Sequence, residues 1–400
     1  MRTYLRQRRK LLWWLTALAL FFAAYFALRT DRTAMNRLCG SVIFPAVRQV
    51  ARLCDGFDGS VGEVLILTAI WAGIIWLACT VRRLIAGPQR CAVLADFVLT
   101  AACLMLTVYG GFCLLWGTAY STDSFQDRSG IVAQPVSVEE LEQVTRYFAS
   151  ELTAAADGVP RDDSGVCAAD RKTILAAAGD AYDGVYDEFP FLRVETGGVK
   201  PFACSNALSV LRFTGFYFPF TGEANVNMDS PVAWLPSTVC HEMAHRMCIA
   251  NERDANFAAF LAASGNSDPQ FRYSAYFMAY RYCISALSTV SSQAAVDART
   301  RVEQGVSDAL RYDMAQYDAF YRTKKNDKAT KAGNAVNNTY LKTSGDSAGL
   351  QSYGEVCDLL VSWHIQQVLL PSLAEEENPF NPLDKTQVDL TGIVHAGGVG

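Results

Sequence analysis

At residues 235–257 the chain reads LPSTVCHEMAHRMCIANERDANF. This stretch contains an H-E-x-x-H motif, formed by His241, Glu242 and His245, and it holds half of the four histidines in the chain. On a helix, residues i and i+4 lie on one face about 6 Å apart, so two imidazoles can bind the same metal ion. The motif therefore predicts a helix over residues 236–247 that carries a zinc site. The alternative is a pair of surface or capping histidines.

A catalytic zinc ion needs a third protein ligand and an open coordination position. No histidine follows His245 before His364, and the nearest acidic residues are Glu252 and Asp254. On one straight helix Glu252 would stand about 10 Å further along the axis, too far to reach the same ion. The helix must therefore break, and Asn251 is a suitable N-cap for a second helix over 252–263. We expect Glu252 to be the third ligand, with Asp254 as the alternative.

The other catalytic roles fall to polar side chains near the motif or late in the chain. Glu242 can take a proton from an attacking water and pass it to a leaving amine. Asn256, one turn beyond the third ligand, can orient a ligand from the second shell. We expect Tyr353 to be the donor that stabilises the oxyanion. His364 is more typical of a core histidine, and His395 lies in a Gly-rich tail where we expect no role.

Residues 202–227 are rich in aromatic and β-branched side chains with interspersed Gly and Pro, which is typical of turns and short strands. The best strand is 223–228. Glu223, Ala224 and Asn225 could form an edge strand that pairs with an extended substrate. The alternative is a purely structural strand that follows a turn at residues 221–222.

Three apolar runs precede this region, at about 11–28, 64–80 and 91–117. Each is long enough, or nearly so, for a helix to cross a hydrocarbon core of about 30 Å. A cleaved signal peptide is the alternative for the first run. That run contains Trp13 and Trp14, and no clear A-x-A site follows it, so we expect a retained helix.

The charge distribution supports this division. Apolar residues make up 51% of the chain and charged residues 19%; residues 1–120 carry a net charge of +8 and residues 121–400 a net charge of −13. The positive charge lies among the apolar runs, which argues against a nucleic-acid partner. The basic N-terminal tail and the basic loop at 81–90 predict a cytoplasmic location for both. The sequence therefore predicts a multi-pass protein of the cell membrane with residues 121–400 on the extracytoplasmic side. The loop at 29–63 is also basic, and an amphipathic segment at 42–53 could lie on the membrane surface.

The rest of the chain is predicted to be mainly α-helical with a small β element, an α+β fold. A linker at 121–136 joins the membrane anchor, residues 1–120, to a zincin-like domain at 137–372, and a tail follows at 373–400. Helices are expected at 138–155, 170–186, 236–247, 252–263, 270–288, 293–324 and 353–370, and a loop flanking a short helix at 325–346. Six of the twelve cysteines lie beyond residue 120, and no C-x-x-C occurs, so a redox motif or zinc ribbon is not supported.

The motifs together resemble the DUF3810 family, bacterial membrane proteins with N-terminal spans and a gluzincin-like metallopeptidase domain. The resemblance rests on the order and spacing of four blocks and covers nearly the whole chain. These blocks are 216–227, 241–245, 252–257 and 352–354.

The resemblance implies a zinc ion held by His241, His245 and Glu252, with Glu242 as the base. This chain departs from the family at Cys248, where the family usually has the Gly that makes the turn after the second histidine. A Cys can be accommodated at this position if the residue avoids positive φ. Its thiolate could also perturb the metal.

These features favour a membrane-anchored zinc metallopeptidase that hydrolyses peptide bonds of a peptide or protein substrate outside the membrane. The alternative is a non-catalytic membrane protein in which the zinc is structural or sensory. The neighbouring Cys240 keeps this alternative open, although it points about 100° away from His241 on the helix.

Overall fold

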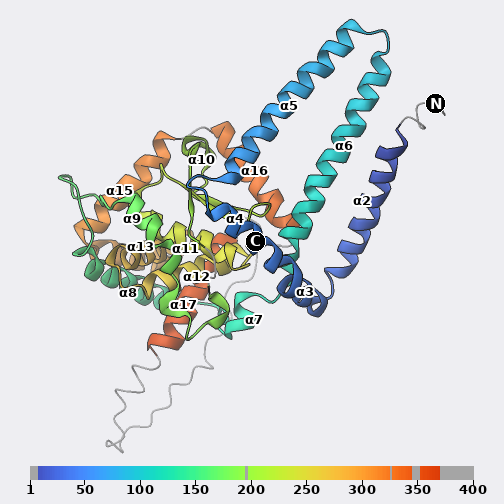
Figure 1. Ribbon diagram of the computed structural model, residues 1–400. Helices are drawn as coiled ribbons and strands as arrows, with labels where there is room; N and C mark the ends of the chain where they lie inside the picture. The colour runs from blue at the N-terminus through green and yellow to red at the C-terminus, as the bar shows by residue number, and fades with distance from the viewer. Residues whose placement is uncertain (1–7, 194–196, 325–326, 345–351, 370–400) are drawn as a thin grey trace, which may run out of the picture.

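The structure is a computed structural model that describes residues 8–193, 197–324, 327–344 and 352–369. A helical domain encloses a small sheet, and a long helical hairpin projects from it with a third apolar helix beside the hairpin (Figure 1). The predicted class, mainly helical with a small β element and apolar N-terminal helices, is therefore confirmed.

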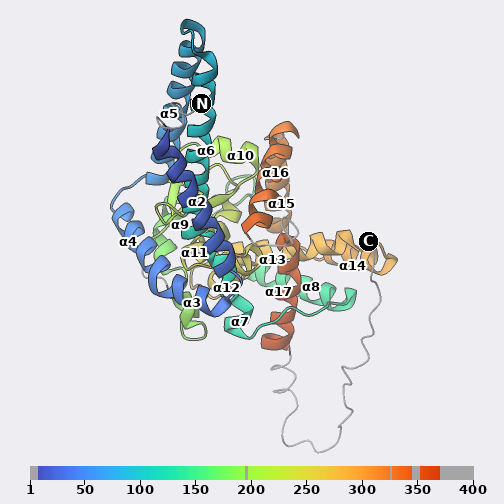
Figure 2. The same cartoon turned by 90° about the vertical axis from the view of Figure 1, so that its right-hand side faces the viewer.

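Three helices are long and apolar enough to cross a membrane, and they associate the chain with a lipid bilayer. They are α2 (Arg9–Leu28), α5 (Val61–Ala86) and α6 (Arg90–Leu115). Helices α5 and α6 form the projecting hairpin, and α2 packs against α6 (Figures 1 and 2). Asp96, the charge inside the third apolar run, forms an ion pair with Arg8, which precedes α2. This pairing makes a carboxylate acceptable within an apolar helix.

The helical domain is built around α8, α11, α12, α13 and α17, which pack against one another. Its remaining helices lie around this group. The domain helices are α7 (Phe125–Ser129), α8 (Val138–Ala156), α9 (Arg171–Ala176), α10 (Ser205–Leu211), α11 (Leu235–Arg246), α12 (Glu252–Ser264), α13 (Pro269–Thr289), α14 (Gln293–Gln304), α15 (Asp308–Thr323), α16 (Asp327–Ser344) and α17 (Ser352–His364). Helix α8 begins with the predicted capping box, in which Ser137 and Glu140 satisfy each other's backbone N–H groups.

The sheet has three strands in the order β1–β3–β2 within the described residues. Strand β3 (Glu223–Asn227) is central; it pairs in parallel with β1 (Lys200–Phe202) and antiparallel with β2 (Gly215–Phe218). All five residues of β3 are buried, whereas β2 is only partly buried. Helix α11 packs against both β2 and β3, so the sheet supports the helix that carries the H-E-x-x-H motif.

Three predicted elements were wrong. The helix expected at 170–186 is only α9 followed by 3-10 turns, and Gly184, in the last of these turns, lies so close to the Gly265 carbonyl that a Cβ there would be 2.9 Å from its oxygen. The single helix expected at 293–324 is divided into α14 and α15 after Gly305. The loop expected around 325–346 is the helix α16, whose Gly333 packs against the Leu211 carbonyl of α10. Gly184 and Gly333 take part in tertiary contacts that local propensity does not register, whereas Gly305 and the N-cap Ser307 are local signals that our prediction overlooked.

The segments that connect the apolar helices to one another and to the domain pack against the domain. The residues expected to form a linker contain α7, whose Phe125 is fully buried in the domain core. The amphipathic segment at 42–53 corresponds to α4 (Phe44–Asp55), which follows α3 (Arg32–Leu38). A Cβ on Gly222 would meet Val47 and Ala51, so α4 packs directly on the turn between β2 and β3.

Candidate metal centre

The H-E-x-x-H helix ends at a turn that the sequence only partly indicated. Helix α11 closes with a Schellman motif, in which the Ile249 N–H donates to the Ala244 carbonyl and the Cys248 N–H donates to the His245 carbonyl. Cys248 occupies the left-handed position of this motif, with φ +68°. The condition under which a Cys is easily accommodated here, a negative φ, is therefore not met, since the motif requires the left-handed conformation whatever side chain stands there.

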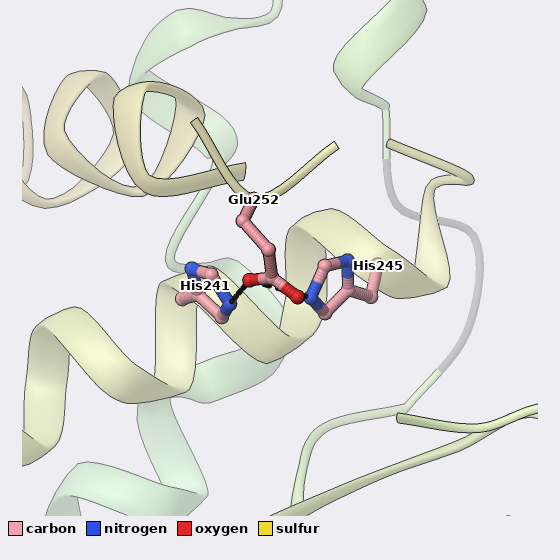
Figure 3. Close-up of side chains that lie close together, drawn as sticks. All are labelled: His241, His245 and Glu252. Atoms are coloured by element: carbon pink, nitrogen blue, oxygen red, sulfur yellow. Dashed lines mark ion pairs between the residues drawn. The ribbon is translucent and has the colours of Figure 1, made fainter. Parts of the chain in front are cut away.

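Helix α12 begins immediately after the turn and returns toward α11. The Asn251 side chain accepts hydrogen bonds from the backbone N–H groups of Arg253 and Asp254, which makes it the predicted N-cap. The new helix places Glu252 between the two histidines (Figure 3). Its Oε2 lies 3.1 Å from His241 Nε2 and 3.8 Å from His245 Nε2. One ligand atom from each of the three side chains falls within 4.8 Å of the others.

The turn also sets the tautomer of one histidine. His245 Nδ1 lies 2.7 Å from the Ile249 carbonyl oxygen, which can only accept a hydrogen bond. Nδ1 therefore carries the proton, and Nε2 presents a lone pair toward Glu252. Burial lowers the pKa of His245 to about 4, which keeps this imidazole neutral at pH 7.

His241 lies in a more polar environment. Burial alone would lower its pKa, but the hydrogen bond to Glu252 and the carboxylate's charge outweigh burial, so the pKa is raised. Asn256, where we expected a side chain that orients a ligand, makes a smaller contribution to the raised pKa of His241. The amide nitrogen of Asn256 and Nδ1 of His241 are buried without a hydrogen-bond partner among the described residues.

Glu242 lies beside this cluster and is only 2% exposed. Burial raises its pKa to about 8, with a smaller upward contribution from the charge of Glu252. Its Oε2 has no hydrogen-bond partner in the described part of the chain. A Cβ added to Gly215 of β2 would be 2.5 Å from Glu242 Oε1, so only glycine leaves room for this carboxylate against the strand. The sequence did not reveal Gly215, because its role depends on the approach of β2 to α11.

A cavity of about 920 Å³ opens onto the cluster. The motif residues and Glu252 line it, together with residues of β2, α6, α13, α15 and α16. Trp116, just after α6, packs edge-on against His245 with ring centroids 5.5 Å apart. Tyr282 of α13 also lines the cavity, and burial, together with the charges of Tyr317 and Glu252, raises its pKa. Sequence reasoning missed both Trp116 and Tyr282, since neither is near the motif in the chain.

Several other candidate residues lie elsewhere. Asp254 turns away from the cluster and accepts a hydrogen bond from the Phe125 N–H, so it anchors α7. Cys240 and Cys248 are buried but do not join the three ligand atoms. His364 packs against Tyr147 with ring centroids 4.2 Å apart, and burial lowers its pKa to about 4, as fits a core histidine.

The predicted substrate strand is in the wrong place for that role. Glu223, Ala224 and Asn225 belong to the central, fully buried strand β3, and the edge strand that lines the cavity is β2. The error arose because strand propensity does not distinguish an edge from a centre. Tyr353 begins α17, but its side chain lies outside the described residues, as does the whole of His395.

The chemistry of the three clustered side chains suits a zinc ion. Two imidazole nitrogens and a carboxylate oxygen form one of the common ligand sets of catalytic zinc sites. A lone pair of His245 faces a carboxylate oxygen of Glu252, and two acceptors so placed repel unless a cation or proton lies between them. The cavity leaves one side of the cluster open, as a fourth coordination position requires.

Fold and site together define a membrane-associated, mainly helical protein with a His–His–Glu cluster that lines a cavity. The chain belongs to the family described as "Protein of unknown function (DUF3810)", whose model matches residues 41–361. This match confirms the family resemblance. Comparisons with curated proteins and with solved structures found no match.

Proposed function

We propose that this protein is a membrane-anchored zinc metallopeptidase that hydrolyses peptide bonds on the extracytoplasmic side of the membrane. The observation that carries the proposal is the convergence of His241, His245 and Glu252 within 4.8 Å at the cavity, with Glu242 beside them. A structural zinc site is closed and usually rich in cysteine, and neither Cys240 nor Cys248 joins this cluster.

His241 and His245 would hold zinc through their Nε2 atoms, and Glu252 through its carboxylate. When bound, zinc supplies a Lewis acid that polarises the scissile carbonyl and activates water. The Glu242 carboxylate would take a proton from the attacking water and deliver it to the leaving amine.

The chain also offers groups that could position the substrate. Strand β2 lines the cavity at the edge of the sheet, so its backbone is placed to pair with an extended peptide. Tyr353 remains our predicted oxyanion donor, and Tyr282, which lines the cavity, is a second phenol available for that role.

The orientation follows from the distribution of basic residues. Arg82 and Arg83 lie near the end of α5 and Arg90 is the first residue of α6, so they belong to the end of the hairpin away from the domain, and the start of α2 lies toward the same end (Figure 1). Basic residues concentrate on the cytoplasmic side of membrane proteins. The domain would therefore face the opposite side. A reporter fused to the C-terminus tests this orientation, and a cytoplasmic signal would contradict it.

The function is tested by measuring zinc content and peptide cleavage of the purified full-length protein and of Glu242→Gln. We expect both proteins to hold about one zinc ion, and the variant to lose cleavage by a factor of 10² or more. Zinc retained by both proteins without cleavage of a diverse peptide library would favour the structural or sensory alternative. Equal cleavage by both proteins would remove Glu242 from the mechanism.

A further inference from the structure

The wall of the cavity includes a helix long enough to cross the membrane. Phe112, in the last turn of α6, and Trp116, just after it, both line the cavity. Trp116 is 2% exposed. Besides its contact with His245, it packs against Tyr217 on β2, with ring centroids 4.6 Å apart. The candidate ligand His245 and the end of an apolar helix are therefore separated by one aromatic ring.

The sheet is joined to the same end of the hairpin. A Cβ on Gly62 of α5 would be 2.8 Å from the Phe218 ring, and one on Gly111 of α6 would be 3.0 Å from the Phe220 ring. The turn between β2 and β3 thus packs against both membrane helices. Because Gly111 lies within α6, this turn reaches at least as far as the last turn of that helix.

At this junction, a buried carboxylate of the domain accepts hydrogen bonds from α5, and a buried carboxylate of α5 accepts hydrogen bonds from the domain. Glu223 of β3 accepts hydrogen bonds from the backbone N–H groups of Val61 and Gly62 at the start of α5. Glu63 of α5 accepts hydrogen bonds from the N–H groups of Ala203 and Cys204 in the domain. Charge-assisted hydrogen bonds between buried groups make a stiff connection, so the position of the domain relative to the start of α5 is set by the fold.

The cavity lies next to the end of α6, a helix long and apolar enough to cross a bilayer. Phe112 lies three residues before the end of α6, a distance of about 5 Å along the helix axis. The headgroup region on each side of a bilayer is itself roughly 5 to 7 Å thick. A peptide bond at the cluster would therefore lie at or just above the headgroups.

We infer that the substrate is a polypeptide tethered to the same membrane, cut within a few residues of the point where it leaves the bilayer. This inference rests on the proposed peptidase function. A tethered chain is held near the cavity at high effective concentration, whereas a free peptide must reach the same position by diffusion. The alternative substrate is a free peptide from solution.

The experiment uses full-length protein in liposomes with one scissile sequence presented in three forms. The sequence is supplied free, or joined to a single membrane helix by a spacer of about four or about thirty residues; the short spacer reaches at most roughly 14 Å. We expect the short-spacer substrate to be cleaved at least about tenfold faster than the free peptide at equal total concentration. Cleavage of the long-spacer substrate alone, or equal rates for the free and tethered forms, would overturn the inference.

A binding measurement separates this inference from the proposed function. The short-spacer substrate, with a photoreactive group at the scissile position, is crosslinked to the Glu242→Gln protein. We expect crosslinks to β2 or to the end of α6. Crosslinks without cleavage by the unaltered protein would contradict the peptidase and retain the membrane-surface binding site. Absence of crosslinks with the short spacer would refute the site, even if free peptides were cleaved.

A matched pair of substitutions on α6 tests the role of that helix. Phe112→Ala removes a cavity-lining ring, whereas Val108→Ala removes a side chain that is 59% exposed one turn earlier. We expect Phe112→Ala to lower crosslinking and cleavage of the short-spacer substrate roughly fivefold more than it lowers those of the free peptide, and Val108→Ala to change neither. Equal losses for the tethered and free forms would show that α6 does not meet the tethered chain.

Discussion

Two buried glutamates near the centre of the molecule have opposite environments. Glu223, on β3, accepts two backbone N–H groups from α5 and the hydroxyl of Thr221. Glu252, at the start of α12, faces the imidazoles of His241 and His245. Both were candidate functional residues from the sequence, and both are less than 10% exposed.

The difference lies in the partners rather than in burial. Backbone N–H groups satisfy a carboxylate permanently and make it part of a structural joint. Imidazole lone pairs beside a carboxylate form a ligand set that a cation can complete. The two glutamates therefore show that the groups that surround a buried carboxylate, and not its degree of burial, indicate its role.

The largest expected effect separates the two roles directly. Glu252→Gln should weaken zinc binding by roughly a factor of 10² and abolish cleavage, because one of three ligands loses its charge. Metal analysis after dialysis and a peptide-cleavage assay in detergent measure the two consequences. Asp254→Asn is the control, and should keep its zinc because Asp254 faces Phe125 instead. Full zinc content in Glu252→Gln would show that Glu252 is not a metal ligand and does not differ in role from Glu223.

The approach of β2 to the site gives the next largest effect. A methyl group at Gly215 would be 2.5 Å from Glu242 Oε1 and 2.7 Å from the Asn225 carbonyl oxygen. Gly215→Ala should therefore displace Glu242 and lower cleavage by roughly 10²-fold while the zinc content is unchanged. Gly179→Ala, where nothing lies within 4 Å of the added carbon, is the matched control. Unaltered cleavage in Gly215→Ala would mean that Glu242 does not need this position.

A smaller effect is expected at the structural glutamate. Glu223→Gln leaves a buried N–H group facing an amide, which should lower the free energy of unfolding by about 2 kcal/mol without loss of zinc. Chemical or thermal unfolding of the full-length protein measures this change. The exposed residue Glu139, changed to Gln, should alter stability by less than about 0.5 kcal/mol. Loss of zinc in Glu223→Gln would assign it to the site as well.

The smallest effect concerns the turn that precedes Glu252. Cys248 is buried and has a left-handed backbone conformation, so removing its side chain changes both the packing and the backbone strain. Cys248→Gly and Cys248→Ala both remove the thiol and differ mainly in their tolerance of positive φ. The glycine variant should be more stable than the alanine variant by about 1 kcal/mol. Equal unfolding midpoints would mean that the turn carries no such strain.

Local signals accounted for much of the fold and site. Ser137 with Glu140 indicated where α8 begins, and Asn251 indicated where α12 begins, since caps act within one turn. The same local argument required a break after His245, which brought Glu252 to the histidines. The three apolar helices were evident because length and hydropathy alone decide whether a helix can cross a bilayer.

Signals that depend on distant contacts were missed or misjudged. Strand β3 was recognised, but its central position was not, because period and propensity are the same for an edge strand. Helix α16 was obscured by its Gly and Asn residues, one of which allows close packing on α10. Gly215 and Trp116 belong to the cavity only because β2 and α6 meet α11 there.

The sequence by itself determined the membrane helices, the family, and the pairing of His241 with His245, since each follows from spacing or composition within one element. Only the tertiary structure decided between Glu252 and Asp254, which strand borders the cavity, and how close the cavity lies to the end of α6. Those choices depend on atoms brought together from α5, α6, β2 and α12, and no local periodicity encodes such distances.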